Sequence, residues 1–111
     1  MLKNRDEILK FLSEKRKSLT ENFHLIKIGL FGSYTRGDNE NGSDIDLIVE
    51  FEENTQNLFD IKRKLKAYIK ENLNLEVDIC REKYIKPRYK KVILNEAKYI
   101  NYRQTSFRIN S

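Results

Sequence analysis

The stretch GSYTRGDNENGSDID, from Gly32 to Asp46, is the most informative part of this chain. It sets a Gly-Ser pair, a loop of turn-forming residues and two alternating aspartates directly between two apolar runs. Three interpretations compete: an ordinary hairpin turn, a metal-binding loop, or the phosphate-binding and metal-binding end of a catalytic site. Residue spacing and the neighbouring runs discriminate among them.

The hairpin-turn interpretation explains the loop but not the aspartates. Asn, Asp, Gly and Ser dominate turns for backbone reasons alone, so NENGSD could be a connection without chemistry. Asp44 and Asp46, however, stand at the start of the apolar run DIDLIVEF. Aspartate is disfavoured in a strand, and a charge near the core is costly unless it is compensated.

A calcium loop of the EF-hand type is excluded by spacing. Its glycine takes the sixth position, so a loop built on Gly42 would begin at Gly37 and end at Ile48. Neither of these residues has a ligating side chain, and the EF-hand interpretation therefore fails.

Strand geometry favours the third interpretation. Residues two apart on a strand share a face and lie roughly 6.5 Å apart along it, so the carboxylates of Asp44 and Asp46 can converge on cations between them. Two magnesium ions about 3.5–4 Å apart would clamp the attacking and leaving oxygens of an in-line displacement. Asp78, in the later run LEVDIC, can supply one more carboxylate. Gly32 would let the backbone approach a phosphate, and the amides and hydroxyl that begin at Ser33 can donate to its oxygens.

The remaining runs predict an α+β fold, a small mixed β-sheet with helices packed against it. The long helical connection after Phe51 permits a parallel crossover, and the short connection before Asp44 permits an antiparallel pair. Hydrophobic periodicity predicts strands over residues 24–32, 44–51, 75–80 and 98–102. It predicts one helix from a capping box at Asn4 and Glu7 through Leu19, a turn or short helix from Ser33, and helices over 58–73 and 88–95.

Length and composition set the limits of the molecule. A chain of 111 residues with 35% charged and 39% hydrophobic residues is expected to form one small globular domain. We expect that domain over residues 1–102 and a flexible tail over 103–111, which leaves no room for a separate acceptor domain. A large substrate is therefore expected to come from another polypeptide.

Charge and cysteine content limit the kinds of partner and the cellular compartment that we expect. The net charge of +5 favours anionic partners such as nucleotides, but basic residues occur along the whole chain, so we do not expect nucleic acid as a partner. Cys80 is the only cysteine, which rules out an internal disulfide and a cysteine-based zinc cluster. No apolar run approaches the ~18 residues of a spanning helix. We expect a cytoplasmic protein without a membrane partner.

The run FGSYTRGDNENGSDIDLIVEF resembles the signature of the DNA polymerase β-like nucleotidyltransferase superfamily, a Gly-Ser followed after ten residues by Asp-x-Asp. In element order, most of the chain is similar to the minimal members of that superfamily, the MNT proteins. The resemblance implies the polymerase β-like fold and magnesium as the cofactor. It also implies transfer of AMP from ATP, a nucleoside triphosphate, to an acceptor hydroxyl with release of pyrophosphate.

The resemblance assigns roles to six residues. It implies that three aspartates are catalytic and bind metal, and that Asp78 among them also assists as a general base. It implies that three further residues bind the nucleotide. Arg36 matches the family's Arg-Gly pair and could contact phosphate, although a structural ion pair that holds the loop is slightly favoured. The metal-binding and catalytic residues are Asp44, Asp46 and Asp78, and the nucleotide-binding residues are Gly32, Ser33 and Arg36.

The acceptor is not fixed by the motif. MNT proteins are commonly paired with HEPN-domain ribonuclease toxins, so the resemblance implies an antitoxin that attaches AMP to a tyrosine of such a toxin. Two alternatives stay open: a non-catalytic antitoxin that acts by occlusion, and a catalytic subunit that modifies a small molecule or RNA. The segment REKYIKPRYKK, residues 81–91, could be an RNA-contacting surface, a solvated helix or a face for a protein partner.

Overall fold

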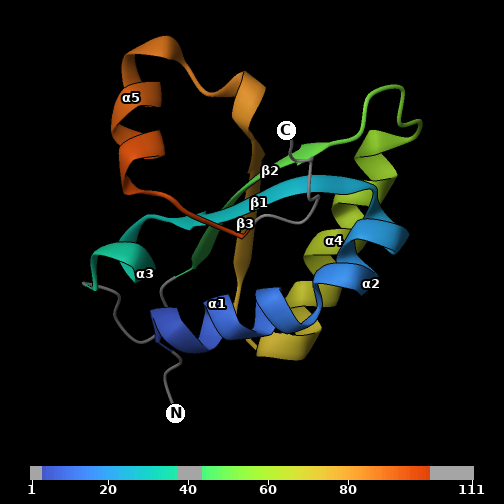
Figure 1. Cartoon of the computed structure of the whole chain (residues 1–111), viewed down its shortest axis with the longest axis horizontal. Coiled ribbons are helices and arrows are strands. Elements are labelled where there is room, and N and C mark those ends of the chain that lie inside the picture. Colours follow the sequence, from blue (N-terminus) through green and yellow to red (C-terminus); the bar gives the residue numbers. More distant parts are fainter. Residues whose placement is uncertain (1–3, 38–43, 101–111) are drawn as a thin grey trace, which may run out of the picture.

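The computed structural model describes residues 4–37 and 44–100, and its strands form one four-stranded sheet in the order β3-β2-β1-β4 (Figure 1). β1 is antiparallel to both β2 and β4, whereas β2 and β3 are parallel. The predicted mixed sheet is therefore confirmed. The strands are β1 (Leu25–Phe31), β2 (Ile45–Phe51), β3 (Val77–Arg81) and β4 (Lys98–Ile100).

The helices follow the predicted periodicity except near the N-terminus. The capping box of Asn4 and Glu7 is present. The helices are α1 (Arg5–Glu14), α2 (Arg16–Phe23), α3 (Ser33–Arg36), α4 (Leu58–Leu73) and α5 (Pro87–Glu96), and a 3-10 turn, η1 (Glu82–Tyr84), follows β3.

The single helix predicted from Asn4 to Leu19 was wrong, because the chain bends at Lys15, where φ is −95° and ψ is 11°. Helical hydrogen bonds nevertheless continue across the bend. The Lys15 amide donates to the Phe11 carbonyl at 3.0 Å, and the Leu19 amide donates to the Lys15 carbonyl at 2.9 Å. The apolar stripe therefore runs on without a break in its spacing, and periodicity could not reveal the bend.

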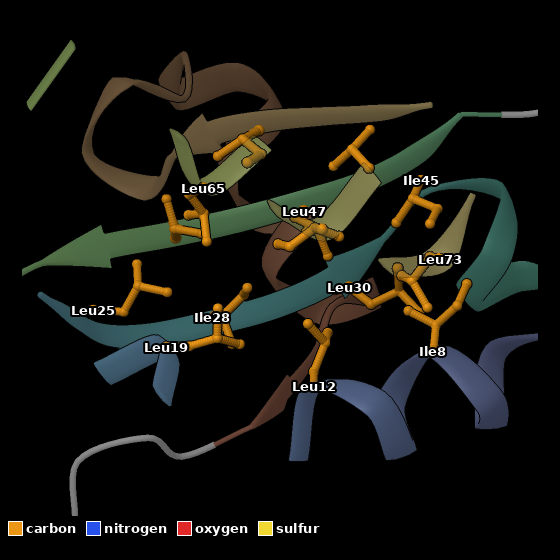
Figure 2. Close-up of a cluster of buried hydrophobic side chains, with 14 of the residues drawn as sticks. Ile8, Leu12, Leu19, Leu25, Ile28, Leu30, Ile45, Leu47, Leu65 and Leu73 are labelled. Carbon is orange, nitrogen blue, oxygen red and sulfur yellow. The ribbon is translucent and has the colours of Figure 1, made fainter. Parts of the chain in front are cut away.

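The hydrophobic core lies between one face of the sheet and the helices α1, α2 and α4 (Figure 2). Alternation along β2 turns Ile45, Leu47 and Val49 toward these helices. The helix predicted over 58–73 is confirmed as α4, and its residues Leu65 and Ile69 are fully buried in that core. Burial of this face fixes the register of the strands, and it thereby fixes what the opposite face presents.

The opposite face of the sheet carries the alternate residues of each strand, and α5 stands on that side of the molecule (Figure 1). Neither η1 nor α5 contains a buried residue. The turn residues 38–43, the last two residues of the strand predicted over 98–102 and the tail predicted over 103–111 lie outside the described residues. In the two described ranges, no helix is long and apolar enough to cross a bilayer.

Candidate functional site

Gly32 joins β1 to α3 in a conformation that glycine alone adopts readily, with φ +79° and ψ −153°. Because Phe31 pairs with Asp46 across the two strands, the next residue lies directly beside that carboxylate. A Cβ atom on Gly32 would overlap Asp46 Oδ2. The absence of a side chain is therefore what allows the turn and the carboxylate to pack together.

The turn after Gly32 is held by its own backbone. The Gly32 carbonyl accepts hydrogen bonds from the Thr35 amide at 3.1 Å, the Thr35 hydroxyl at 2.7 Å and the Arg36 amide at 3.2 Å. The short helix expected from Ser33 is thus confirmed. The first amides of a helix have no acceptor within it, so the amide and hydroxyl of Ser33 can donate to an anion placed at this end.

Three aspartates are brought to the same face of the sheet at this point. Asp44 directly precedes β2, Asp46 is its second residue, and Asp78 is the register partner of Asp46 on β3. Residues two apart on a strand share a face, and paired residues on adjacent strands do so as well, with the strands about 4.8 Å apart. The carboxylates singled out from the sequence therefore gather beside the Gly32 turn.

The electrostatics of Asp46 reflect this crowding. Burial, followed by the charges of Asp78 and Asp44, raises its pKa above the ordinary value, and Glu96 adds a smaller effect in the same direction. Arg36 opposes these effects and lowers the pKa. Carboxylates that repel one another in a half-buried place are stabilised by a nearby cation.

The donor set fits a hard divalent cation. In the part of the chain that the structure describes, no group of three or more His, Cys, Asp or Glu side chains could hold a metal ion by itself. Magnesium, however, commonly takes one or two carboxylates and completes its shell with water and substrate phosphates. Asp44 and Asp46 offer that chemistry beside a turn that can receive a phosphate.

Arg36 is linked to a residue that the sequence did not single out. Its Nη1 donates to Glu96 Oε1 at 2.5 Å, which ties α3 to the end of α5. Sixty residues separate the two partners, so no local spacing pointed to the pair. The one available signal was the isolated acidic residue at the end of an otherwise basic helix.

A pocket of about 410 Å³ adjoins the same turn. It lies between α3 and the start of α1, where Arg5 Nη1 donates to the Thr35 carbonyl at 3.3 Å. Tyr34 is almost completely buried in this region, and its pKa is raised first by burial and then by the charge of Asp44. The pocket is lined by Asn4, Arg5, Asp6, Tyr34, Thr35, Arg36 and Gly37.

Comparison with known sequences gives matches over nearly the whole chain. Residues 5–100 match the family model of the nucleotidyltransferase domain. The chain is 37% identical over 95 residues to the protein adenylyltransferase MntA of Thermococcus cleftensis, a match that covers 86% of this chain and 94% of that protein. It is also 37% identical over 100 residues to a Methanocaldococcus jannaschii protein provisionally named a protein adenylyltransferase, covering 89% of this chain and 100% of that protein.

Comparison with solved structures gives the same kind of protein. A structure provisionally described as a minimal nucleotidyltransferase superposes with a TM-score of 0.70 and 31% identity, covering 86% of this chain and 95% of that one. A toxin-antitoxin structure with AMP-PNP has a TM-score of 0.63 and 24% identity, covering 94% of this chain and 76% of that one. The second likeness is one of fold alone.

Proposed function

The chain belongs to the nucleotidyltransferase domain family and has the expected polymerase β-like fold, and on this premise we propose that it transfers AMP from ATP to a hydroxyl group of another protein. The observation that carries the proposal is the seating of Asp46 against Gly32 and beside Asp78, at the family's motif. The names of the curated relatives, which are protein adenylyltransferases, support a protein as the acceptor.

The proposed roles follow from the chemistry of each group. The turn at Gly32 and Ser33 receives the triphosphate, and Arg36 contacts a phosphate oxygen. Asp44, Asp46 and Asp78 would hold magnesium, which when bound neutralises phosphate charge and favours displacement at phosphorus.

In the proposed reaction, the acceptor oxygen forms a bond to the α-phosphorus as the bond from that phosphorus to the bridging oxygen breaks. Pyrophosphate leaves with the electron pair of the broken bond. The hydroxyl proton passes to the carboxylate of Asp78, which acts as the general base.

The acceptor that we propose is a tyrosine of a HEPN-domain ribonuclease toxin, as the family resemblance implies. Transfer of AMP would silence the toxin and make this chain its antitoxin. The reaction would take place in the cytoplasm, where ATP is available and the lone Cys80 remains reduced.

The proposal is tested by intact-mass spectrometry of the HEPN-domain protein after co-expression with this chain. Wild type should add the mass of one or more AMP groups, and digestion should locate them on tyrosine. The matched variant Asp44→Asn should leave the partner unmodified although it still copurifies. An unmodified partner in the wild-type complex would instead support inhibition by occlusion.

The pair of Arg36 and Glu96 gives a further prediction. Because Glu96 holds the guanidinium beside the site, Glu96→Ala should raise the KM for ATP about two- to fivefold, the effect of an ion pair of roughly 0.4–1 kcal/mol, and should leave kcat within about twofold. Arg36→Ala should raise the KM further, on the order of tenfold. Steady-state kinetics at varied ATP concentration measure both.

A double-mutant cycle separates positioning from a general charge effect. If Glu96 acts through Arg36, adding Glu96→Ala to Arg36→Ala should change the KM no further. Asp60→Ala is the matched control. It removes the ion pairs of Asp60 with Arg63 and Lys64, which lie within α4 and away from the site. Additive effects in the cycle, or an equal effect of the control, would contradict the positioning role.

A further inference from the structure

The excess positive charge of the chain lies on one segment. Residues 83–95, here called the basic arm, contain five basic and no acidic residues. The whole chain has 22 basic and 17 acidic residues, so the remainder has 17 of each and is neutral. Although basic residues occur everywhere in the sequence, the net charge of this arm therefore equals that of the whole chain. Its basic residues are Lys83, Lys86, Arg88, Lys90 and Lys91.

Apolar side chains are exposed on the same arm. Tyr84 is 69% exposed, Tyr89 is 50% exposed and Val92 is 66% exposed, and they are three of the four large hydrophobic residues that stand out in solvent among the described residues. Tyr89 and Val92 are three residues apart, so they share one face of α5. Exposed aromatic and aliphatic side chains rimmed by charge are typical of a protein interface.

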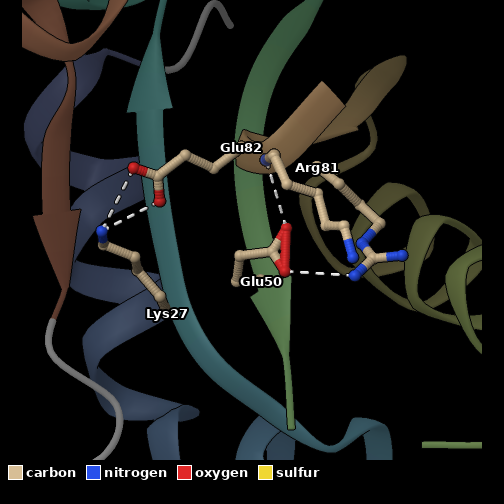
Figure 3. A network of polar contacts seen from close by, with 5 residues as sticks. Lys27, Glu50, Arg81 and Glu82 are labelled. Carbon is tan, nitrogen blue, oxygen red and sulfur yellow. Dashed lines mark hydrogen bonds and ion pairs between the residues drawn. The ribbon is translucent and has the colours of Figure 1, made fainter. Parts of the chain in front are cut away.

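The base of the arm is fixed to the sheet by polar contacts (Figure 3). Lys27 Nζ pairs with Glu82 Oε2 at 2.9 Å, and Arg81 Nη2 pairs with Glu50 Oε2 at 3.2 Å. The Arg81 guanidinium also lies 5.1 Å from the centre of the Tyr84 ring. A surface that is already ordered loses less entropy when a partner binds.

The other end of the arm reaches the candidate active site. α5 ends at Glu96, whose carboxylate pairs with Arg36 beside the aspartates. A helix of ten residues is about 15 Å long, so a partner seated along α5 could place one of its side chains at the Gly32 turn. Docking and chemistry would then occur on one continuous surface.

We propose that the basic arm is the docking surface for the acceptor protein, which presents acidic residues to the arm and an apolar side chain to Tyr89 and Val92. The inference rests on the proposed function and names where its protein substrate binds. Positive charge on the arm calls for a negative partner, and the exposed apolar pair calls for a side chain that can be buried.

RNA also carries negative charge, but the contacts on the arm favour a protein. The ring of Tyr84 already has Arg81 and Lys83 over it, at 5.1 and 5.6 Å from its centre. The Arg88 guanidinium lies 4.8 Å from the centre of the Tyr89 ring. Rings covered in this way offer less free surface for stacking a base, and Val92 offers a base no hydrogen bond.

The test is the double charge reversal Arg88→Glu with Lys91→Glu. It should raise the KM for the HEPN-domain acceptor protein, and its Kd measured by calorimetry, by about tenfold or more, because it replaces attraction with repulsion. The KM for ATP should stay within about twofold, since neither residue touches the aspartates. The matched control, Lys17→Glu with Lys66→Glu, makes the same change in net charge on α2 and α4.

A second variant tests the apolar contact and guards against misfolding. Tyr89→Ala with Val92→Ser should also weaken acceptor binding about tenfold or more while the thermal midpoint stays near that of wild type, because α5 buries no residue.

Equal acceptor binding by wild type and both arm variants would overturn the docking surface while leaving AMP transfer intact. Arm variants that bind the acceptor protein like wild type but no longer bind a single-stranded RNA oligonucleotide would overturn the proposal in favour of an RNA-binding surface. No transfer by wild type would instead overturn the proposed function and the docking surface with it.

Discussion

Asp46→Asn is expected to reduce AMP transfer on the order of a thousandfold or more while making the folded protein more stable at neutral pH. Asparagine has nearly the same shape, but it cannot supply the negative charge that would hold magnesium beside the triphosphate. The gain in stability follows from the raised pKa of Asp46, since burial and the neighbouring charges of Asp78 and Asp44 disfavour its ionised form. Transfer assays and thermal unfolding of the same preparation measure both effects.

The pH dependence of the stability tests independently whether the ionised Asp46 weakens the fold. A carboxyl whose pKa is raised in the folded state binds a proton more readily there than in the unfolded chain, so its ionised form weakens the fold at neutral pH. That penalty falls as the pH drops through the raised pKa and is gone below the ordinary value of 3.8. The stability advantage of Asp46→Asn should therefore be largest near neutral pH and shrink in acid.

Asp60→Asn is the matched control, because hydrogen bonds from Arg63 and Lys64 lower the pKa of Asp60. A lowered pKa means that the ionised form stabilises the fold above the ordinary value, and that this contribution is lost as the pH falls through the folded pKa. Asp60→Asn should thus destabilise the protein at neutral pH and leave transfer unchanged. An Asp46→Asn protein that is less stable than wild type at neutral pH, or that still transfers AMP, would contradict the assigned environment.

Gly32→Ala is expected to reduce transfer about a hundredfold or more and to destabilise the fold by roughly 1–3 kcal/mol. Its φ of +79° with ψ of −153° is strained for any residue with a side chain. The added methyl group would also overlap Asp46 Oδ2, so the carboxylate would have to move away from the turn. Transfer is measured per folded molecule, with the folded fraction taken from chemical denaturation.

Gly37→Ala separates strain from displacement of the carboxylate. Gly37 has a φ of +81°, but a Cβ atom built there meets nothing within 4 Å. The substitution should therefore cost about 1–2 kcal/mol of stability and leave transfer within a few-fold of wild type. If the two variants lost transfer equally, the contact of Gly32 with Asp46 would not be what organises the site.

Much of the fold follows from patterns that are local in the sequence. Alternation along DIDLIVEF placed Asp46 opposite the core face, and the same alternation in LEVDIC turned Asp78 away from Val77 and Ile79. Because the core fixes the strand register, the carboxylates of Asp46 and Asp78 necessarily lie on the same face once β2 and β3 pair. The register of β1 with β2 likewise places the Gly-Ser turn, at the end of β1, beside Asp46.

The remaining features depend on how the elements pack. The pair of Arg36 and Glu96 joins α3 to the end of α5, so it depends on where that helix returns to the sheet and not on any spacing along the chain. Periodicity also predicts which face of α5 is apolar, but it does not predict whether anything covers that face. The exposure of Tyr89 and Val92 is therefore visible only in the structure.

The most direct test of AMP transfer by these carboxylates uses ATP labelled on the α-phosphate. The purified chain is incubated with this ATP, magnesium and the HEPN-domain protein, and the products are separated on a gel. γ-Labelled ATP serves as the control for phosphorylation. We expect α-label on the HEPN-domain protein, no γ-label, and loss of the α-label with Asp44→Asn although that variant still binds the partner. A stable wild-type complex without α-label on the partner, or continued transfer by Asp44→Asn, would contradict the assignment.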